Sequence, residues 1–175
     1  MALERIRALI CDVDGVLTDG SIMLAEDGTE IKRFNSQDGA GIALFVRSGF
    51  QVGFLTGRES GAVTKRAREL GVQHVRQGAG DKIPPYEEIR VAMGVADAEV
   101  CYVGDDLPDV PVMRRVGYAV AVADARPEVR AAARLVTQAA GGRGAVREVI
   151  DRILEAHGLW DDILRRYQVP WGEPR

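Results

Sequence analysis

A pair of carboxylates near the amino terminus is the feature of this sequence best suited to chemistry. Asp12 and Asp14 are separated by one residue, follow the apolar run at residues 8–11 and precede Gly15. Ligands of an open parallel sheet bind at the carboxyl ends of its strands, so acids in this position indicate a ligand site. Carboxylates withdrawn from water need a cation, most simply a divalent metal. We interpret this stretch as the nucleophile loop of a metal-dependent phosphoryl-transfer enzyme.

Three further strand-like runs end in polar residues. Thr56 follows the run at 51–55, Lys82 lies in a glycine-bearing loop, and Asp105 and Asp106 follow the run at 100–103. Each is weak evidence alone, because loop lysines and Gly-Asp-Asp turns are common on protein surfaces. Two acidic clusters with a hydroxyl and a lysine between them are a more specific signal. Phosphoryl transfer needs this set: a nucleophile, a metal, cations around the phosphoryl oxygens and an acid for the leaving group.

The elements that would position these residues alternate along the chain. Strands are predicted near residues 8–11, 51–55, 72–75, 100–103, 118–122 and 135–136. Helices are predicted near 40–48, 60–70, 84–93, 110–116, 127–133 and 145–154, with a polar, turn-rich stretch at 35–39 leading into the first of them. Such alternation favours an α/β fold, a Rossmann-like doubly wound and mainly parallel sheet with helices on both faces.

A β-hairpin is predicted at about residues 21–34, inserted between the first strand and its helix. Its turn is Asp27-Gly28, one of the strongest short-range hairpin signals. The hairpin could be a flap over the site, an assembly surface, or both. An isolated two-stranded ribbon is marginal in water, so packing against a neighbouring subunit and packing on its own domain both remain open. One face is expected to be apolar through Ile22, Leu24, Ile31 and Phe34.

Composition limits the class of protein. The 175 residues are 46% hydrophobic and 28% charged with a net charge of −3, which fits one soluble domain spanning 1–175 and argues against binding nucleic acid or an anionic membrane. No apolar stretch reaches membrane-spanning length and no signal-peptide pattern is present, so we expect a cytoplasmic protein. Cys11 and Cys101 are expected to be buried and reduced. The tail at about 160–175 could be a docking segment or loose chain.

The order and spacing of these motifs resemble the haloacid dehalogenase superfamily of phosphatases over nearly the whole chain. Its four motifs correspond to Asp12-Val13-Asp14-Gly15-Val16, Thr56, Lys82 and Gly104-Asp105-Asp106-x-x-Asp109. The resemblance implies that Asp12 attacks phosphorus and becomes an aspartyl-phosphate. It implies that Asp14 protonates the leaving alcohol and then activates water.

The same resemblance implies roles for the other motif residues. Thr56 would donate to a phosphate oxygen, and Lys82 would neutralise the nucleophile and the developing charge. Mg²⁺ would be held by the Asp12 carboxylate, the Asp14 backbone carbonyl and Asp105. Asp106 and Asp109 would orient Lys82 or metal-bound water. Many members of the superfamily insert a cap domain; only the hairpin is inserted here, so we expect no cap domain and closure of the site by oligomerisation.

A closer resemblance is to the 3-deoxy-D-manno-octulosonate 8-phosphate phosphatases. It is carried by the stretches at 11–20, 34–42, 102–107, 119–125 and 141–149. It implies hydrolysis of that sugar-acid phosphate within lipopolysaccharide biosynthesis, and a homotetramer in which a neighbour completes each site. It also implies a substrate pocket formed by Asp14, Asn35, Asp38, Gly39, Arg58, Arg66 and Lys82.

The sequence departs from this family at one position. Those phosphatases carry a substrate-contacting arginine where this chain has Ala43. A missing guanidinium removes a bidentate partner for the carboxylate of a sugar acid. Either Arg66 or another basic residue compensates, or the substrate is a sialic-acid-type nonulosonate 9-phosphate. Whether Arg143 acts in its own or a neighbouring site stays open.

A different class of protein also combines clustered Asp, Thr and Lys on a parallel sheet. Receiver domains are non-catalytic signalling modules that store a phosphoryl group on an aspartate. In receivers the early acidic pair binds metal and the phosphorylated aspartate comes two strands later, whereas here Asp14 is placed to hydrolyse a phosphoenzyme. That placement favours turnover over storage. A dead enzyme kept as a binding partner is disfavoured because no motif residue is missing.

Overall fold

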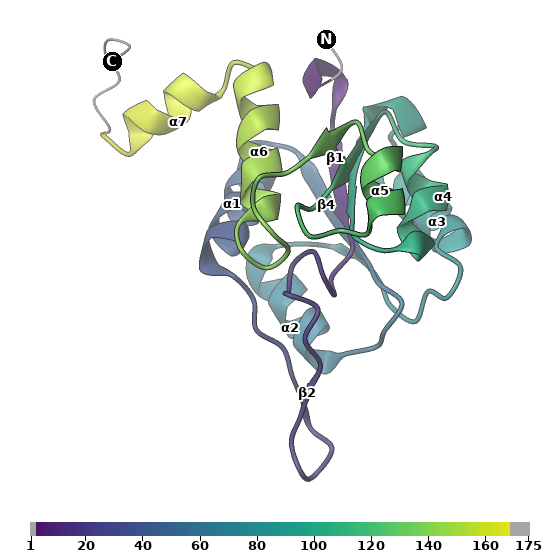
Figure 1. Cartoon of the computed structure of the whole chain (residues 1–175). Coiled ribbons are helices and arrows are strands. Elements are labelled where there is room, and N and C mark those ends of the chain that lie inside the picture. The colour runs from purple at the N-terminus through teal and green to yellow at the C-terminus, as the bar shows by residue number, and fades with distance from the viewer. Residues whose placement is uncertain (1–2, 169–175) are drawn as a thin grey trace.

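A six-stranded parallel sheet forms the centre of the molecule, and the computed structural model describes residues 3–168 (Figure 1). The strands pair in the order β5-β4-β1-β6-β7-β8, and every neighbouring pair is parallel. Strand order reverses between β1 and β6, which places a crevice at their carboxyl ends. The predicted α/β fold with a doubly wound parallel sheet is therefore confirmed. The strands are β1 Ala8–Cys11, β4 Gln51–Leu55, β5 His74–Arg76, β6 Val100–Gly104, β7 Tyr118–Ala121 and β8 Leu135–Val136.

Helices cover both faces of this sheet (Figure 1). One group packs around α1, which contacts α2 and α6; the other packs around α4, which contacts α3 and α5. Because both faces are covered, central strands read as continuous apolar runs, and all four residues of β1 are fully buried. The helices are α1 Ser36–Arg47, α2 Gly61–Leu70, α3 Ile83–Met93, α4 Val110–Met113, α5 Pro127–Ala132, α6 Ala145–Ala156 and α7 Trp160–Arg166, with 3₁₀ turns η1 Leu3–Arg5, η2 Asp97–Glu99 and η3 Leu107–Asp109.

The first helix begins earlier than the sequence predicts. Asn35 is its N-cap: the side-chain Oδ1 accepts from the backbone N–H of Gln37 at 2.7 Å and of Asp38 at 3.3 Å. An Asn side chain placed this way satisfies N–H groups that have no partner inside the helix. The polar stretch at 35–39, predicted as a turn, is therefore a cap and a first helical turn. The strand predicted at 72–75 also lies slightly later, at His74–Arg76.

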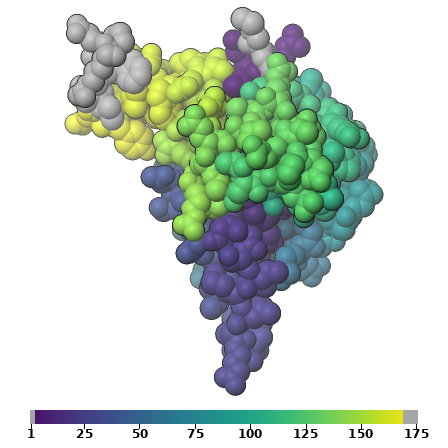
Figure 2. All heavy atoms as spheres, in the orientation of Figure 1, coloured from purple at the N-terminus to yellow at the C-terminus, as the bar shows by residue number. Residues whose placement is uncertain are grey.

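The predicted hairpin is present as a separate two-stranded antiparallel ribbon. It consists of β2 Met23–Leu24 and β3 Glu30–Ile31, and the turn between them includes Gly28 in the left-handed region at φ +83°. The ribbon extends from the body of the molecule as a narrow arm, coloured purple-blue in Figures 1 and 2. Its tip therefore does not lie on its own domain.

Three of the four apolar side chains predicted on one face of the hairpin are exposed, and the fourth is not. Ile22, Leu24 and Ile31 are 58%, 65% and 53% exposed, as expected for a free apolar surface. Phe34 does not belong to that surface: it packs against the domain's own core, with the Arg66 guanidinium 5.9 Å from its ring centroid. Residues 31 and 34 differ by an odd number of positions, so in extended chain their side chains point to opposite sides.

The first part of the predicted tail is ordered structure. It forms α7, which packs on α6 and buries Ile163, while the Arg147 guanidinium lies 5.9 Å from the Trp160 ring. This part is therefore not loose chain, and residues 169–175 lie outside the described part of the chain. Within residues 3–168, no helix combines the length and apolarity that crossing a bilayer requires.

Candidate active site

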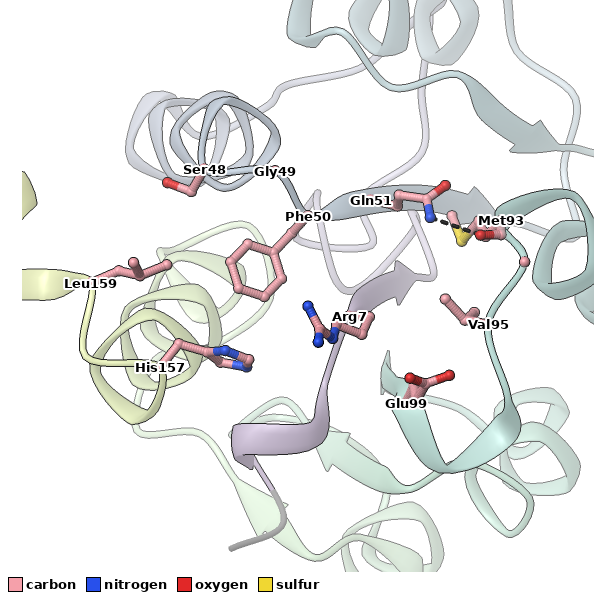
Figure 3. Close-up of a pocket in the computed structure, with 11 residues that line it drawn as sticks. Arg7, Ser48, Gly49, Phe50, Gln51, Met93, Val95, Glu99, His157 and Leu159 are labelled. Carbon is pink, nitrogen blue, oxygen red and sulfur yellow. Dashed lines mark hydrogen bonds between the residues drawn. The ribbon is translucent and has the colours of Figure 1, made fainter.

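A cleft of about 260 Å³ lies at the carboxyl ends of the central strands. Its lining includes Asp12, Asp14, Thr56, Arg58, Lys82 and Asp105, so the structure brings together every predicted catalytic and metal-binding residue. A larger cavity, of about 520 Å³, lies at the opposite edge of the sheet (Figure 3). That cavity includes the side chains of Arg7, Phe50 and His157 and holds no residue of the predicted site.

Asp12 is the centre of the cleft. It follows β1 directly, and its backbone N–H extends the sheet by donating to the Val103 carbonyl at 3.0 Å. Its Oδ1 accepts from the Val13 N–H at 2.6 Å, and its Oδ2 lies 2.9 Å from Lys82 Nζ. The Asp12 side chain is only 11% exposed. A buried carboxylate held in this way has a fixed direction toward the cleft, which suits a nucleophile.

Lys82 is held from its other side by Asp109. The ammonium donates to Asp109 Oδ1 at 2.6 Å, and the Tyr102 hydroxyl donates to the same oxygen at 2.6 Å. Asp109 Oδ2 accepts from the backbone N–H groups of Asp105 at 3.0 Å and Asp106 at 3.2 Å. Asp109 therefore orients Lys82, as the sequence led us to expect. Nothing in the sequence pattern had singled out Tyr102, because a tyrosine within an apolar strand is normally a core residue.

Asp106 does not share that role. Its Oδ1 accepts from the Leu107 N–H at 2.8 Å at the start of η3, and it lies 3.8 Å from the Arg126 guanidinium. Its side chain is 57% exposed. Asp106 shapes the loop after β6, while Asp109 holds the lysine.

The charges of the site are unbalanced. Burial raises the pKa of Asp12 to about 6, although Lys82 works against this. Burial and the neighbouring carboxylates of Asp12 and Asp109 raise the pKa of Asp105 to about 8. Burial works to lower the pKa of Lys82, but the same two carboxylates outweigh it and hold that pKa above its usual range. Asp12, Asp105 and Asp109 lie around the one ammonium of Lys82, so a further cation would relieve the repulsion among these three carboxylates.

The donor set fits a divalent metal ion. Oxygens of Asp12, Asp105 and Asp109 lie within 4.8 Å of one another. Asp105 Oδ1 is buried and has no hydrogen-bond partner among residues 3–168. Each Asp109 oxygen already accepts two hydrogen bonds. Each Asp12 oxygen has one partner and Asp105 Oδ1 has none, so Asp12 and Asp105 have the freer oxygens. Hard cations such as Mg²⁺ prefer carboxylate oxygen ligands, and this cluster supplies them.

Asp14 has a partner that the sequence analysis did not identify. Its Oδ1 accepts from Lys32 Nζ, and its Oδ2 is buried without a partner among the described residues. Lys32 comes from the chain that returns from the hairpin to α1. The sequence did contain a signal. In extended chain the side chains of Glu30, Lys32 and Phe34 point to one side, and Phe34 packs against the core.

Four predicted substrate residues, Asn35, Asp38, Gly39 and Arg66, line a separate small hollow around the start of α1 and do not line the cleft. Asn35 caps that helix, and Gly39 lies against Arg66, since a Cβ on Gly39 would be 2.0 Å from Arg66 Nη2. Asp38 is buried, and its oxygens accept from the backbone N–H groups at the start of α6, Gly144 at 3.1 Å and Arg147 at 2.8 Å. In this chain Asp38 therefore joins α1 to α6.

Two further arginines take different places. Arg58 lines the cleft, is 46% exposed and pairs with Glu30 at 2.9 Å. Arg143 is 61% exposed and lies 3.6 Å from Asp19. Ala43 lies on α1, whose residues do not line the cleft. Arg58 thus offers its guanidinium to a ligand bound in this cleft.

Comparison with known proteins identifies relatives along most of the chain. The sequence profile of the haloacid dehalogenase-like hydrolases matches residues 79–150. The 3-deoxy-D-manno-octulosonate 8-phosphate phosphatase of Escherichia coli is 47% identical over 159 residues, covering 91% of this chain and 85% of the relative.

Solved structures agree with the sequence relatives. The phosphatase of that name from Yersinia pestis superposes with a TM-score of 0.90 at 46% identity, covering 91% of this chain and 86% of the other. The Moraxella catarrhalis enzyme, solved in complex with a magnesium ion, a phosphate ion and a KDO molecule, superposes with a TM-score of 0.93 at 37% identity, covering 95% of this chain and 96% of the other.

Proposed function

This chain belongs to the haloacid dehalogenase-like hydrolases, in the family of the 3-deoxy-D-manno-octulosonate 8-phosphate phosphatases, and we propose that it hydrolyses 3-deoxy-D-manno-octulosonate 8-phosphate to the free sugar acid and inorganic phosphate. The observation that carries the proposal is the buried Asp12 carboxylate, 2.9 Å from Lys82 and beside Asp105. That arrangement offers a nucleophile, a cation and an oxygen cluster for a metal in one cleft.

In the first step, an oxygen of Asp12 attacks phosphorus and the bond from phosphorus to the sugar oxygen breaks. Asp14 transfers its proton to that sugar oxygen, so the leaving group departs as an alcohol. The product on the enzyme is an aspartyl-phosphate. Lys82 would stabilise this step, because its ammonium lies 2.9 Å from the Asp12 carboxylate and is therefore close to the phosphoryl oxygens on which negative charge develops.

In the second step, water attacks the phosphorus of the aspartyl-phosphate. Asp14 takes a proton from that water, and the bond between phosphorus and the Asp12 oxygen breaks. Inorganic phosphate leaves, and the Asp12 carboxylate and the protonated Asp14 are restored. One carboxyl group thus gives a proton in one half-reaction and receives one in the other.

The remaining site residues bind and orient the phosphoryl group. Thr56, at the end of β4 and 1% exposed, would donate its hydroxyl to a phosphate oxygen. Asp12, Asp105 and the Asp14 backbone carbonyl would hold Mg²⁺, which supplies positive charge for the nucleophile and the phosphoryl oxygens. Arg58 would contact the ligand from the rim, while Asn35, Asp38, Gly39 and Arg66, which line a separate small hollow, would bind the sugar-acid part of the substrate.

A panel of substrates tests this function. Phosphorylated octulosonate, phosphorylated nonulosonates and simple hexose phosphates are assayed for phosphate release with Mg²⁺. The octulosonate is expected to be preferred. Preference for a nonulosonate 9-phosphate would support the alternative raised by Ala43, and equal rates on all would reduce the protein to a general small-molecule phosphatase. Release of no more than one phosphate per chain would indicate a phosphoryl-storing module and contradict the proposal.

We also propose that the hairpin at about 21–34 assembles the protein into a homotetramer and acts as a flap completing a neighbour's site. Two observations support this. Ile22, Met23, Leu24 and Ile31 are exposed on the hairpin, and the tip of the hairpin projects away from the rest of the molecule (Figure 2). Contiguous exposed apolar residues of this kind mark interaction surfaces.

We further propose that residues 1–175 belong to one hydrolase domain. A cytoplasmic location is proposed on the two cysteines, which are buried and unpaired.

A further inference from the structure

One side of the chain returning from the hairpin faces the active site. Side chains alternate along an extended strand, and here Glu30 and Lys32 are 17% and 3% exposed, whereas Arg33 on the other side is 62% exposed. A lysine is rarely buried to this degree unless it is paired. Its partners therefore indicate what it does.

Lys32 has two acidic partners that belong to different parts of the protein. Its ammonium donates to Asp14 Oδ1 in the nucleophile loop and lies 3.5 Å from Glu30 Oε1 in the hairpin. Glu30 in turn pairs with Arg58, 2.9 Å away at the rim of the cleft. Glu30 and Lys32, at the base of the hairpin, thus form ion pairs with residues on two sides of the cleft, Arg58 and Asp14.

The contact with Asp14 uses one oxygen and leaves the other free. Oδ2 is buried, has no partner among residues 3–168 and belongs to a side chain that lines the cleft. A carboxyl group that must exchange a proton with a ligand needs this arrangement, with one oxygen fixed and one available. A carboxylate without the fixed contact would be free to turn toward water or toward another cation of the site.

We propose that Lys32 is a positioning residue for Asp14: by holding Oδ1, it directs Oδ2 toward the leaving oxygen and the attacking water. The inference rests on the proposed function and adds a residue to it. It also links catalysis to the hairpin, because the same strand that presents Ile31 outward presents Lys32 inward. Movement of the arm would therefore shift the proton donor.

The two half-reactions let this role be measured. When the sugar phosphate reacts, the leaving alkoxide needs the Asp14 proton as the bond from phosphorus to oxygen breaks. When p-nitrophenyl phosphate reacts, p-nitrophenolate leaves without a proton. Hydrolysis of the aspartyl-phosphate is the same for both substrates and needs Asp14 to accept a proton from water. Loss of positioning should therefore depend on the leaving group, whereas general loss of the fold should not.

The experiment compares Lys32→Met, Lys32→Arg and the control Arg33→Met with wild type, all with Mg²⁺. Arg33 follows Lys32 in the same returning segment and pairs with Asp19, so its variant also removes an ion pair of that segment but leaves Asp14 untouched. For Lys32→Met, kcat/KM on the sugar phosphate should fall about 30-fold or more, a large part of the roughly 100- to 10,000-fold that general acid catalysis typically contributes. Its kcat/KM on p-nitrophenyl phosphate should change by less than about threefold, with a burst of p-nitrophenolate because kcat falls.

Lys32→Arg keeps the charge and should recover most of the loss, and Arg33→Met should resemble wild type on both substrates. Equal losses on both substrates, no recovery with arginine, or a similar effect of Arg33→Met would show that Lys32 only fastens the hairpin, and would overturn the inference. Failure of wild type to hydrolyse the sugar phosphate while it hydrolyses p-nitrophenyl phosphate would instead reject the proposed substrate. The leaving-group comparison between an alkyl phosphate and the aryl phosphate would still decide the role of Lys32.

Discussion

The carboxylate of Asp105 occupies the space that a side chain on residue 15 would need. A Cβ placed on Gly15 would lie 2.1 Å from Asp105 Oδ2 and 2.5 Å from its Cγ, far inside van der Waals contact. Gly15 is also in the left-handed region at φ +87°, which L side chains adopt only with strain. The turn after Asp12 can therefore approach the acid that follows β6 only because residue 15 is glycine.

Gly15→Ala should displace Asp105 and weaken the metal site. The left-handed strain alone costs about 1–2 kcal/mol. Gly49 separates the two effects, since it has φ +91° with nothing within 4 Å of an added Cβ. We expect Gly49→Ala to lower the free energy of unfolding but to keep the affinity for Mg²⁺. Gly15→Ala should lower both the free energy of unfolding and the affinity for Mg²⁺. Denaturant unfolding measures the first quantity and titration calorimetry the second. Unchanged Mg²⁺ affinity in Gly15→Ala would contradict the assignment of Asp105.

Asp12→Asn should abolish turnover. The amide is a poor nucleophile and cannot form the aspartyl-phosphate, so kcat should fall about 1,000-fold or more. Thermal unfolding and sedimentation should show that the fold and assembly persist, because Asn keeps the shape of the side chain. Phosphate release within about tenfold of wild type would remove Asp12 as nucleophile.

The metal-free protein should lose stability as pH rises. Asp105 has a folded-state pKa of about 8, above the ordinary carboxyl value of about 3.9. Between these values the folded state keeps a proton that the unfolded chain has released, so the free energy of unfolding falls as pH increases. Asp105→Asn has no such proton and should show a flatter dependence after chelation. A wild-type slope equal to that of the variant would exclude the effect.

Mg²⁺ should reverse this loss. Binding requires deprotonated carboxylates, so the ion competes with the proton on Asp105. The increase in melting temperature on adding Mg²⁺ should therefore be larger at about pH 8.5 than at about pH 6, where the proton is held more firmly. Chelation should silence phosphatase activity and Mg²⁺ should restore it. An equal thermal shift at both pH values would argue against Asp105 as a ligand.

Asp38→Ala should destabilise the fold. The substitution leaves the N–H groups of Gly144 and Arg147 without their acceptor across the α1–α6 contact, at a cost of about 1–3 kcal/mol. Asp161→Asn, an exposed acid in the first turn of α7, is the control and should change the free energy of unfolding by less than about 1 kcal/mol. An increase in KM for the sugar phosphate without loss of stability would show that Asp38 serves the substrate alone.

Leu24→Glu should shift the protein to smaller species. A charge in the middle of the exposed apolar arm opposes its burial against another copy. Glu26→Gln, near the same turn and also exposed, should leave assembly unchanged. Sedimentation at several protein concentrations, with activity measured in parallel, distinguishes the two. A wild-type monomer with full activity would refute closure of the site by neighbours.

The sequence alone was enough for the order of elements and for the main chemical residues. Central strands such as β1 are buried on both faces and read as apolar runs, and the polar residue after each run marks its carboxyl end. Since parallel strands place those ends at one edge, Asp12, Thr56, Lys82 and Asp105 could be assigned to one site before any contact was known. These inferences need only local patterns and the geometry of a parallel sheet.

Other assignments depended on side-chain direction and on contacts between distant residues. Asp38 joins a helix more than a hundred residues away, and Phe34 turns into the core while Ile31 faces outward. Lys32 is one polar residue among several in the hairpin sequence, and only the fold places its ammonium on Asp14. Spacing along the chain determines which edge of the sheet a residue reaches. Only tertiary packing determines which neighbour its side chain meets, because that depends on where separate segments come together in space.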